Sequence, residues 1–377
     1  MTVRNDARSA LVVGGGIAGL TAAIALSRRG WQVEVAEINA DWSVAGWGLS
    51  LTGPSLRALD QLGLTDDCVA LGYGVSQITN CDSAGQPANV IDLPRLAGPQ
   101  RPSQVGLARP ALHRLLHAAA LADGARLRAG STVTGLQEEE GGDGIRAELS
   151  DGSSRLVDLV VGADGIRSSV RALLGIIGGL RYGGQLVWRA IVPRPAWATT
   201  LLTFAGPEHN AGVIPISARQ AYVFVTENGA VAAALPPAEL ASRMRELLGA
   251  FSGRVAEVRD TIRDPADVVR RPVQTTIIDG PWHRGRAVLI GDAAHAPSPQ
   301  MVSGAALAIE DATVLAEELD RGDKTEAALA AFGRRRLDRC RFLVQTSIQI
   351  AALEQQGRHA ELNRLQQDCH RRMAETA

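Results

Sequence analysis

The chain has 377 residues, of which 46% are hydrophobic, and its 39 Lys and Arg nearly balance its 40 Asp and Glu. This length indicates two domains, or one large domain with an insertion, and the balanced charge removes the usual electrostatic case for nucleic acid or an acidic membrane surface as a partner. The four cysteines lack CxxC spacing, and the chain has no run of about 20 unbroken apolar residues. We therefore expect a reducing, cytoplasmic location, no metal site and no membrane span.

A glycine-rich turn follows the first predicted strand, residues 10–13. Residues 14–19 have the pattern G-x-G-x-x-G, a segment with helical apolar spacing runs to Gly30, and a second predicted strand, 32–36, leads to Glu37. The first glycine allows a tight bend, the second lets the backbone approach a pyrophosphate, and the third lets the helix pack against the strand. An acid about 20 residues on can bind a ribose hydroxyl. We expect a dinucleotide site rather than a glycine-rich turn without ligand, with the contacts Gly14, Gly16, Ile17, Ala18, Gly19 and Glu37.

Short alternating segments fill the middle of the chain and predict β-strands. One group covers 125–129, 131–138, 144–149 and 156–162, with a hairpin turn at 141–144; another covers 185–193, 199–205, 212–216 and 221–226. A helix is predicted over 238–252, and the Arg-rich segment from Glu326 onward is predicted to be a solvated helix.

A second turn of interest begins at residue 286 with the sequence RAVLIGDAAH. A predicted strand, 287–290, ends in Gly291-Asp292, a Pro-rich loop follows, and Gly304 begins a predicted helix over 305–319. A carboxylate at the C-terminal edge of a strand points into the ligand crevice of an open α/β sheet. The helix start can stabilise negative charge on a reduced flavin. This turn favours a flavin as the dinucleotide, with a plain turn or capping aspartate as the alternative.

Three separated motifs together resemble those of the FAD-dependent aromatic hydroxylases, the single-component flavoprotein monooxygenases of the p-hydroxybenzoate hydroxylase type. They are the first turn, the segment DLVVGADGIRSSVR at 158–171, and the segment 291–311; Arg109-Pro-Ala-Leu and Trp188-Arg189 are weaker echoes. The resemblance covers about residues 10–345. It implies an α/β fold in which a Rossmann-like FAD-binding domain of the glutathione-reductase type is interleaved with an antiparallel β-sheet substrate domain. The implied boundaries are 1–73, 105–178 and 275–345 for the FAD-binding domain, 74–104 and 179–274 for the substrate domain, and 346–377 for a helical tail, with crossings at Gly178-Gly179 and Pro272.

The resemblance also assigns roles to particular residues. It implies that Asp164 serves in both FAD and NAD(P)H binding, unless it is only a turn residue, that Asp292 holds the ribityl or pyrophosphate side, and that Pro299 lies beside the isoalloxazine. The loop 46–50 would run along the flavin. The cofactor contacts expected outside the first turn are Gly48, Arg109, Val133, Asp164, Gly165, Gly291, Asp292, Gly304 and Ala305.

The chain departs from the common pattern of this family in three places. Ile38 stands where an arginine is frequent, Val302 and Ser303 stand where Gly-Gln is frequent, and Ala306 stands where an asparagine is frequent. The last two departures lie near the flavin pyrimidine ring, so they bear on flavin mobility and potential.

The implied reaction is hydroxylation of a small aromatic or polyketide-like substrate, with non-covalent FAD, NADH or NADPH as co-substrate, O₂, and a flavin C4a-hydroperoxide, in a monomer or homodimer. Tyr222, His209 and Arg189 are candidate substrate-pocket residues. The plainer alternatives are a half-buried sheet tyrosine, a loop histidine and an arginine in an ion pair, and His295 is expected to be structural. Another FAD oxidoreductase on the same scaffold, such as an oxidase or dehydrogenase, and a non-catalytic flavin-binding protein stay open as alternatives.

Overall fold

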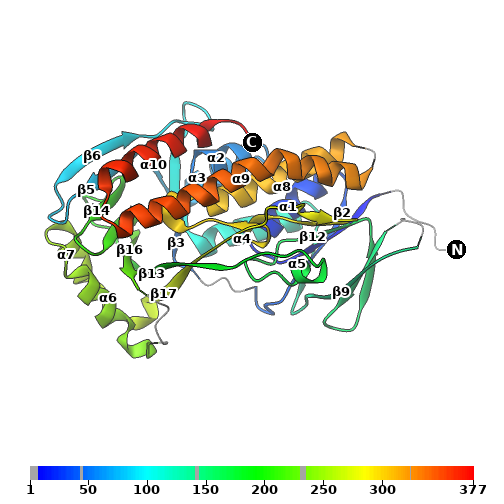
Figure 1. Cartoon of the computed structure of the whole chain (residues 1–377), viewed down its shortest axis with the longest axis horizontal. Coiled ribbons are helices and arrows are strands. Elements are labelled where there is room, and N and C mark those ends of the chain that lie inside the picture. The colour runs from blue at the N-terminus through cyan, green and yellow to red at the C-terminus, as the bar shows by residue number, and fades with distance from the viewer. Residues whose placement is uncertain (1–6, 43–45, 141–143, 230–234, 323) are drawn as a thin grey trace.

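The buried apolar strand β1, Ser9–Val13, lies inside a six-stranded sheet of order β18-β19-β12-β1-β2-β8. The computed structural model describes residues 7–42, 46–140, 144–229, 235–322 and 324–377 (Figure 1). The other strands of this sheet are β2 Gln32–Glu37, β8 Arg126–Ala129, β12 Leu159–Gly162, β19 Ala287–Leu289 and β18 His283–Arg284. Neighbouring strands are parallel except at β18, as expected for strands joined by crossover connections.

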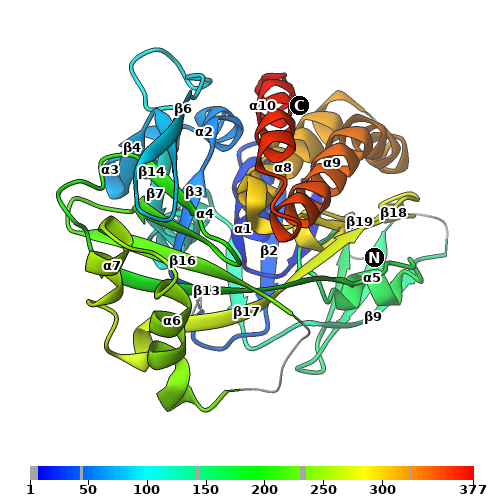
Figure 2. The ribbon, with the colours of Figure 1, turned by 60° about the vertical axis from the view of Figure 1, so that its left-hand side comes forward.

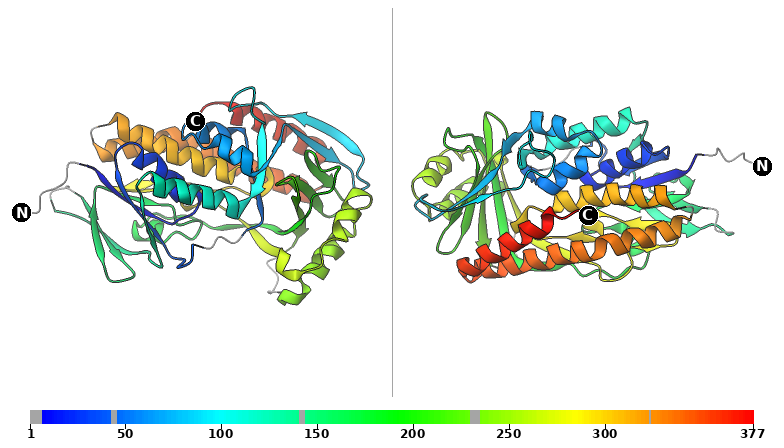
Figure 3. Two further views of the ribbon diagram at one scale, coloured as in Figure 1. Left: turned by 180° about the vertical axis from the view of Figure 1, so that it is seen from behind. Right: turned by 90° about the horizontal axis from the view of Figure 1, so that it is seen from above.

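Helices cover this sheet and bring distant parts of the chain together. Helix α1, Ile17–Ser27, packs against both α4, Arg109–Ala122, and α8, Gly304–Arg321. Helix α9, Thr325–Gln355, runs beside α8, and α10, His359–Ala374, folds back onto α9 (Figure 3). Within the described ranges, no helix combines the length and hydrophobicity needed to cross a membrane.

Two small sheets and short helices adjoin the six-stranded sheet. The first is an antiparallel meander of β9 Val133–Glu138, β10 Ile145–Leu149 and β11 Ser154–Val157; the second contains β3 Gly48–Leu51, β7 Gln104–Ala108 and β4 Tyr73–Val75. The short helices are α2 Gly53–Asp60, α3 Thr65–Leu71 and α5 Ser169–Leu173.

An eight-stranded sheet forms the other large layer, in the order β20-β17-β13-β16-β15-β14-β5-β6. Its strands are β20 His295–Ala296, β17 Val268–Ile277, β13 Arg181–Pro193, β16 Gln220–Asn228, β15 Asn210–Pro215, β14 Leu201–Ala205, β5 Gln77–Cys81 and β6 Pro87–Asp92. Neighbouring strands are antiparallel except β14 and β5.

The two faces of this sheet bury different side chains, because residues alternate along each strand. On one face, Trp188 and Val223 pack with Met244 under α6, Leu240–Leu248, and α7, Arg254–Arg259 (Figure 2). On the other face, Ile214 and Tyr222 pack near Ala108 of β7. We refer to this second face as the inner face, since it lies against the β3–β7 sheet.

The structure corrects the expected strand 156–162, which is two strands in two different sheets, β11 and β12. The break falls at Asp158, whose carboxylate accepts hydrogen bonds from the backbone N–H and hydroxyl of Ser9 at 2.8 and 2.9 Å. The bond ties β1 to the start of β12, so the carboxylate serves the sheet and ends the meander.

Three smaller observations concern the ends of elements. Strand β17 continues through Pro272, which lies opposite Leu186, where the register of β13 and β17 shifts, a position at which a sheet tolerates a missing N–H; a domain crossing at Pro272 stays a prediction. The helix expected over 238–252 is shorter, a 3₁₀ turn followed by α6. The expected hairpin turn falls on residues 141–143, outside the described residues.

The interleaved domain boundaries stay a prediction. The expected tail at 346–377 has no break of its own, because α9 is continuous from Thr325 to Gln355. Leu362, Cys369 and Met373 of α10 join the same buried core as β1 and α8, so the Arg-rich tail packs on that layer.

Candidate FAD and substrate site

The glycines of the first turn each meet a different steric demand. Gly14 has φ +104°, and a Cβ there would lie 2.4 Å from the carbonyl oxygen of Ala163. A Cβ on Gly19 would lie 1.9 Å from the carbonyl oxygen of Gly14, so α1 packs directly on the turn. At Gly16, which precedes α1, a Cβ would meet no described atom within 4 Å. The turn is thus closed on its inner side and open where the helix start could face a pyrophosphate.

Glu37 braces this turn from the end of β2. Its carboxylate accepts hydrogen bonds from the backbone N–H of Gly15 at 2.6 Å and of Asn39 at 2.9 Å. The geometry therefore shows that Glu37 stabilises the turn. A hydrogen bond from Glu37 to a ribose stays a prediction.

Aromatic residues around Gly15 were missed in the sequence. A Cβ on Gly15 would lie 2.2 Å from the ring of Trp42, and Nε2 of His113 lies 2.8 Å from the Gly15 carbonyl oxygen. The Trp42 ring also meets His117 edge-on, with ring centroids 4.9 Å apart. Their positions follow from the packing of α4 against α1, which local sequence patterns do not show.

The second turn is a 3₁₀ turn, Gly291–Ala293, that packs against α1. Gly291 has φ +59°, and a Cβ there would lie 2.9 Å from Cβ of Ala18, so the predicted contacts Ala18 and Gly291 meet. Asp292 is solvent-exposed, yet protein surrounds it closely enough that burial raises the pKa of its carboxyl, against the opposite effect of His295 and Arg109. The side chain of Asp292 is therefore accessible to a ligand, and its contact with FAD stays a prediction.

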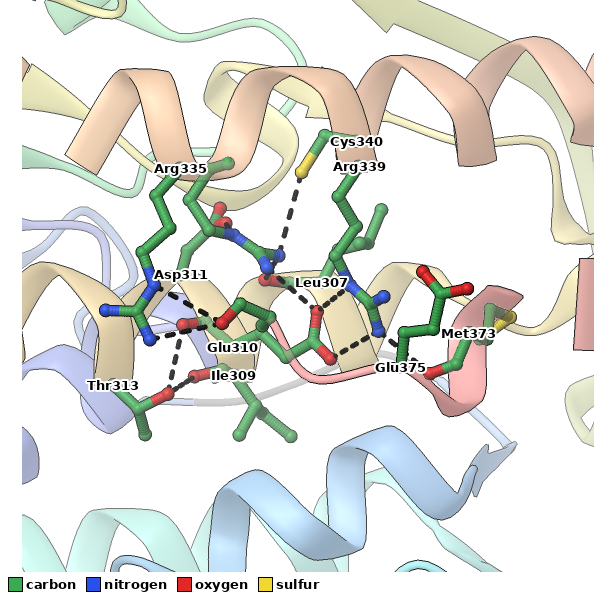
Figure 4. Close-up of polar contacts among 12 residues, drawn as sticks. Leu307, Ile309, Glu310, Asp311, Thr313, Arg335, Arg339, Cys340, Met373 and Glu375 are labelled. Carbon is green, nitrogen blue, oxygen red and sulfur yellow. Dashed lines mark hydrogen bonds and ion pairs between the residues drawn. The ribbon is translucent and has the colours of Figure 1, made fainter. Parts of the chain in front are cut away.

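A buried charge network holds this turn from behind. The Asp311 carboxylate accepts a hydrogen bond from the Gly291 N–H at 2.8 Å, lies 2.6 Å from Nε2 of His295, and pairs with Arg336 at 2.8 Å. Next to it, Glu310 pairs with Arg336 at 3.0 Å and Arg339 at 2.8 Å. Figure 4 shows Glu310 and Asp311 of α8 facing Arg339 and Cys340 of α9.

The charges in this network reinforce one another. Burial alone would raise the pKa of Asp311, but His295 and Arg336 outweigh it and hold the pKa below its ordinary value. Burial lowers the pKa of His295, whereas Cys340 and Asp311 raise it, and the balance lies well above the ordinary value. The contact of His295 with Asp311 favours its protonated form, and its full burial behind the turn is consistent with the structural role expected from the sequence.

The same network brings His295, Asp311 and Cys340 together, with donor atoms within 4.8 Å of one another. That spacing would suit metal ligands. However, a metal ligand must be deprotonated, and here His295 is held protonated while Arg336 already neutralises Asp311. The chemistry of the donor set argues for an ion-pair network.

Asp164 has two different carboxylate oxygens. Oδ2 accepts hydrogen bonds from the backbone N–H and hydroxyl of Ser169 at 2.7 and 2.8 Å and from the N–H of Val170 at 3.0 Å. Oδ1 is buried and has no hydrogen-bond partner among the described residues. Asp164 thus holds the start of α5, as a turn residue would, and retains one oxygen. Gly165, next to it, has φ +82°, and contact of either residue with FAD or NAD(P)H stays a prediction.

The Pro299 turn and the start of α8 are expected to lie beside the flavin. Pro299 begins a 3₁₀ turn, Pro299–Met301, that precedes α8, whose first residues are Gly304 and Ala305. Val302 has φ +51°, a conformation in which a β-branched residue is strained. This explains why glycine is frequent at that position among the enzymes that the chain resembles.

Arg109 and Gly48 are neighbours where β3 pairs with the end of β7. A Cβ on Gly46 would lie 2.7 Å from Cδ of Arg109, and the Arg109 N–H donates to the Trp47 carbonyl oxygen at 3.1 Å. Val133 differs, because its side chain is buried in the core and its backbone pairs with Leu149. Any contact of Val133 with a cofactor is through the main chain.

Tyr222 and Arg189 lie together on the inner face of the eight-stranded sheet. The register places Arg189 opposite Phe224 and Ile191 opposite Tyr222. Burial raises the pKa of Tyr222, and Arg189 opposes the rise; burial also lowers the pKa of Arg189. Among the described residues, Arg189 makes no ion pair within 4.0 Å, and a Cβ on Gly48 would lie 2.0 Å from the Tyr222 ring. Tyr222 is therefore in contact with β3, and Arg189 lies beside Tyr222 on the same face.

The structure separates His209 from this pair. His209 precedes β15 and lines a cavity of about 330 Å³ with Arg243, Glu246 and Leu247 of α6, on the face opposite Tyr222. Its Nε2 lies 4.0 Å from Glu208. We remove His209 from the candidate substrate residues, because successive residues of a strand point to opposite faces.

Comparison with known proteins agrees with this geometry. A family model described as an FAD binding domain matches residues 8–347. The chain is 31% identical over 349 residues to the aurachin C monooxygenase/isomerase of Stigmatella aurantiaca, covering 92% of this chain and 89% of that protein. It is 32% identical over 359 residues to the 2-heptyl-3-hydroxy-4(1H)-quinolone synthase of Pseudomonas aeruginosa, with coverages of 92% and 89%.

The fold agrees with that of HpxO from Klebsiella pneumoniae, solved in complex with FAD and uric acid. The two structures superpose with a TM-score of 0.84 at 25% sequence identity, over 97% of this chain and 95% of that one. Gly16 has open space beside it, Asp292 is exposed and Asp164 has one oxygen without a hydrogen-bond partner among the described residues; contact of these residues with FAD stays a prediction. The chain belongs to the FAD-dependent aromatic hydroxylases, a family of flavoprotein monooxygenases.

Proposed function

We propose that this enzyme uses NADH or NADPH and O₂ to hydroxylate a small aromatic or polyketide-like substrate. The observation that carries the proposal is the contact of the Tyr222 ring with Gly48, which puts a buried tyrosine and an unpaired arginine beside the strand expected to line the flavin. The quinolone named for one relative and the uric acid bound to HpxO are small ring compounds, which supports a substrate of this size.

The chain's own residues would divide the work between cofactor and substrate. The open N–H groups at Gly16 would bind the pyrophosphate, while Asp292 and Arg109 would hold the flavin half from opposite sides. Bound FAD would supply the redox chemistry, taking a hydride from NAD(P)H and delivering oxygen from O₂ to the substrate. The positive end of α8 at Gly304 would stabilise negative charge on the ring system.

Arg189 would anchor and orient the substrate. A buried guanidinium without a carboxylate partner is costly unless it meets an anion, so it favours a substrate with an anionic or strongly polarised oxygen. Tyr222 would donate a hydrogen bond next to it. Mostly aliphatic side chains line the rest of the inner face, including Ile191 and Ile214, and these exclude water from the reacting ring.

Purified protein should carry FAD, and a suitable aromatic compound should stimulate NAD(P)H oxidation. With ¹⁸O₂, one labelled oxygen atom should enter the product. Labelled hydrogen peroxide without labelled product would instead support an oxidase, and substrate oxidation without either labelled compound would support a dehydrogenase. Bound flavin that neither NADH nor NADPH reduces would support the non-catalytic alternative.

A further inference from the structure

A polar cluster lies at the end of α9, where the sheet and the Pro299 turn meet. Gln300 donates one hydrogen bond to the Glu354 carboxylate at 3.1 Å and one to the Gln185 side-chain oxygen at 2.9 Å. Gln185 in turn donates to the Asn228 side chain at 3.0 Å, and Asn210 also hydrogen-bonds to Glu354. We call Glu354, Gln300, Gln185 and Asn210 the amide cluster. It contains one carboxyl group surrounded by neutral amides.

The cluster is next to both the expected flavin side and the substrate face. Gln300 directly follows Pro299 in the turn before α8. Gln185 lies on β13 four residues before Arg189, so both side chains point to the inner face, about 13 Å apart along the strand. The amide cluster and the Tyr222–Arg189 pair therefore lie at the two ends of one stretch of the inner face. The distance between them leaves room for a substrate with a ring system.

Glu354 has an unusual electrostatic environment for a carboxyl group. Burial raises its pKa to about 7, although hydrogen bonds from Gln300, Asn210 and Gln185 oppose the rise. No charged side chain among the described residues contributes to this shift. A carboxyl group with a pKa near neutrality can accept and return a proton at physiological pH, as a general base should.

The charged and titratable groups on the surrounding elements are engaged elsewhere or lie apart from Glu354. Arg270 and Glu227 point to the opposite face of the sheet with Trp188, Arg271 is exposed, and Arg358 pairs with Glu361 at 2.8 Å. His295 on β20 pairs with Asp311. Tyr182 on β13 donates to the Gly229 carbonyl oxygen, and the remaining groups are Arg181 and Arg189 on β13 and Tyr222 on β16. The end of α9 is held by Gln355, which donates to the Gly183 carbonyl oxygen at 3.1 Å.

We propose that Glu354 is the residue that takes a proton from the substrate, and that the substrate is a heteroaromatic compound with an ionisable ring N–H. This inference rests on the proposed hydroxylase function. The substrate N–H bond breaks, its electron pair stays on the ring, and the proton moves to a carboxylate oxygen of Glu354. The ring becomes more electron-rich and so a better acceptor of oxygen. When the oxygen derived from O₂ has bonded to the ring carbon, that carbon loses its hydrogen as a proton to the oxygen atom left behind, and Glu354 returns its own proton to the ring nitrogen; the exchange at Glu354 therefore consumes nothing beyond the reactants of the proposed hydroxylation.

The test uses the FAD-loaded enzyme, Glu354→Gln, and Glu361→Gln as a matched control that removes an exposed carboxylate from the next helix. The probes are 4(1H)-quinolone and its N-methyl derivative, which lacks the ring N–H. Binding is followed by the change in flavin absorbance between about pH 5.5 and 8.5. Melting temperature and flavin content establish that both variants fold.

The wild-type and control enzymes should bind 4(1H)-quinolone more tightly as the pH rises through about 7, since only ionised Glu354 accepts the proton. Glu354→Gln should bind it about 10- to 100-fold more weakly, the loss expected for a charged hydrogen bond, with no pH step. All three proteins should treat the N-methyl compound alike. Equal affinity for both probes, no binding of either, or an unchanged pH profile in Glu354→Gln would overturn the proposal.

A second measurement keeps the inference separate from the proposed function and from misfolding. The infrared carbonyl band of a protonated carboxylic acid should appear in the wild-type enzyme as the pH falls through about 7 and be missing in Glu354→Gln. If the band titrates elsewhere, the proposal for Glu354 fails even where NAD(P)H oxidation and product formation are intact. If the band and the binding step are present but no oxygen enters any product, the hydroxylase function fails instead.

Discussion

Replacing Asp311 by Asn tests whether the charge network behind the Asp292 turn holds the cofactor site in place. Asp311 is fully buried and joins three partners: the Gly291 N–H, His295 and Arg336. Asparagine has nearly the same volume, so it creates no cavity, but it turns one acceptor oxygen into an N–H donor that faces other donors. His295 loses its carboxylate partner, and Arg336 keeps only its ion pair with Glu310.

The expected cost is large because breaking one side of a buried ion pair typically costs about 3–5 kcal/mol. We expect a loss of that size in the free energy of unfolding, together with weaker FAD binding, since Gly291 loses the bond that fixes its turn. Chemical unfolding of the apo protein and titration with FAD measure the two effects. Asp338→Asn is the matched control: this exposed carboxylate pairs with Arg341 at 3.0 Å, and surface pairs contribute at most about 1 kcal/mol.

The pH dependence provides an independent check on the same network. The pKa of Asp311 is lowered on folding, so its contribution to stability is present above the ordinary carboxyl pKa and is lost as the pH falls through the lowered value. The pKa of His295 is raised well above 6.5, so its contribution is full below 6.5 and is lost as the pH rises through the raised value. In Asp311→Asn, the free energy of unfolding should therefore change less with pH, both on the acidic side and on the alkaline side. A loss below about 1 kcal/mol with an unchanged profile would refute the reasoning.

Three further predictions concern the turns and the substrate face. Gly19→Ala should lower the melting temperature of the apo protein, because its Cβ would lie 1.9 Å from a carbonyl oxygen, whereas Gly16→Ala should leave that temperature nearly unchanged and weaken FAD binding about tenfold; equal effects on apo stability would count against the assigned roles. Val302→Gly should not destabilise the protein, because relief of a left-handed conformation, about 1–2 kcal/mol, offsets the usual cost of glycine, about 0.5–1 kcal/mol; a drop in melting temperature would contradict this. Arg189→Met should raise KM for an anionic aromatic substrate about 10- to 100-fold without loss of flavin, while Arg271→Met, an exposed control, should not; unchanged KM would show that Arg189 does not contact the substrate.

The cofactor half of the site was largely predictable because its constraints are local. Gly14, Gly19 and Gly291 meet steric demands set by the backbone within a turn and by the strands beside it. Such demands can be recognised from the spacing of glycines in the sequence. The family could therefore be predicted from three short segments. Even here the sequence could not show that Glu37 braces the turn or that Trp42 covers Gly15, since those contacts depend on packing between helices.

The substrate half was less predictable because it depends on long-range packing and on strand phase. Glu354 lies 54 residues after Gln300 in the sequence, and Gln300 lies 115 residues after Gln185. These three residues meet only because α9 passes over the Pro299 turn. A glutamate in a polar helix gives no indication in the sequence that it will lie in this cluster.

His209 shows that a prediction off by one residue along a strand places the side chain on the wrong face of the sheet. The sequence makes His209 a candidate substrate-pocket residue, but its neighbour Asn210 is the residue that hydrogen-bonds to Glu354 on the inner face. A difference of one residue moves a side chain to the other face of a sheet, and alternation alone did not reveal which face would meet the flavin. That choice follows from the contact of Tyr222 with Gly48, which joins two segments more than a hundred residues apart. A proton acceptor for the substrate must therefore be sought among residues that share the face of Tyr222, and within the described residues Glu354 is a carboxyl group at this face whose pKa lies near neutrality.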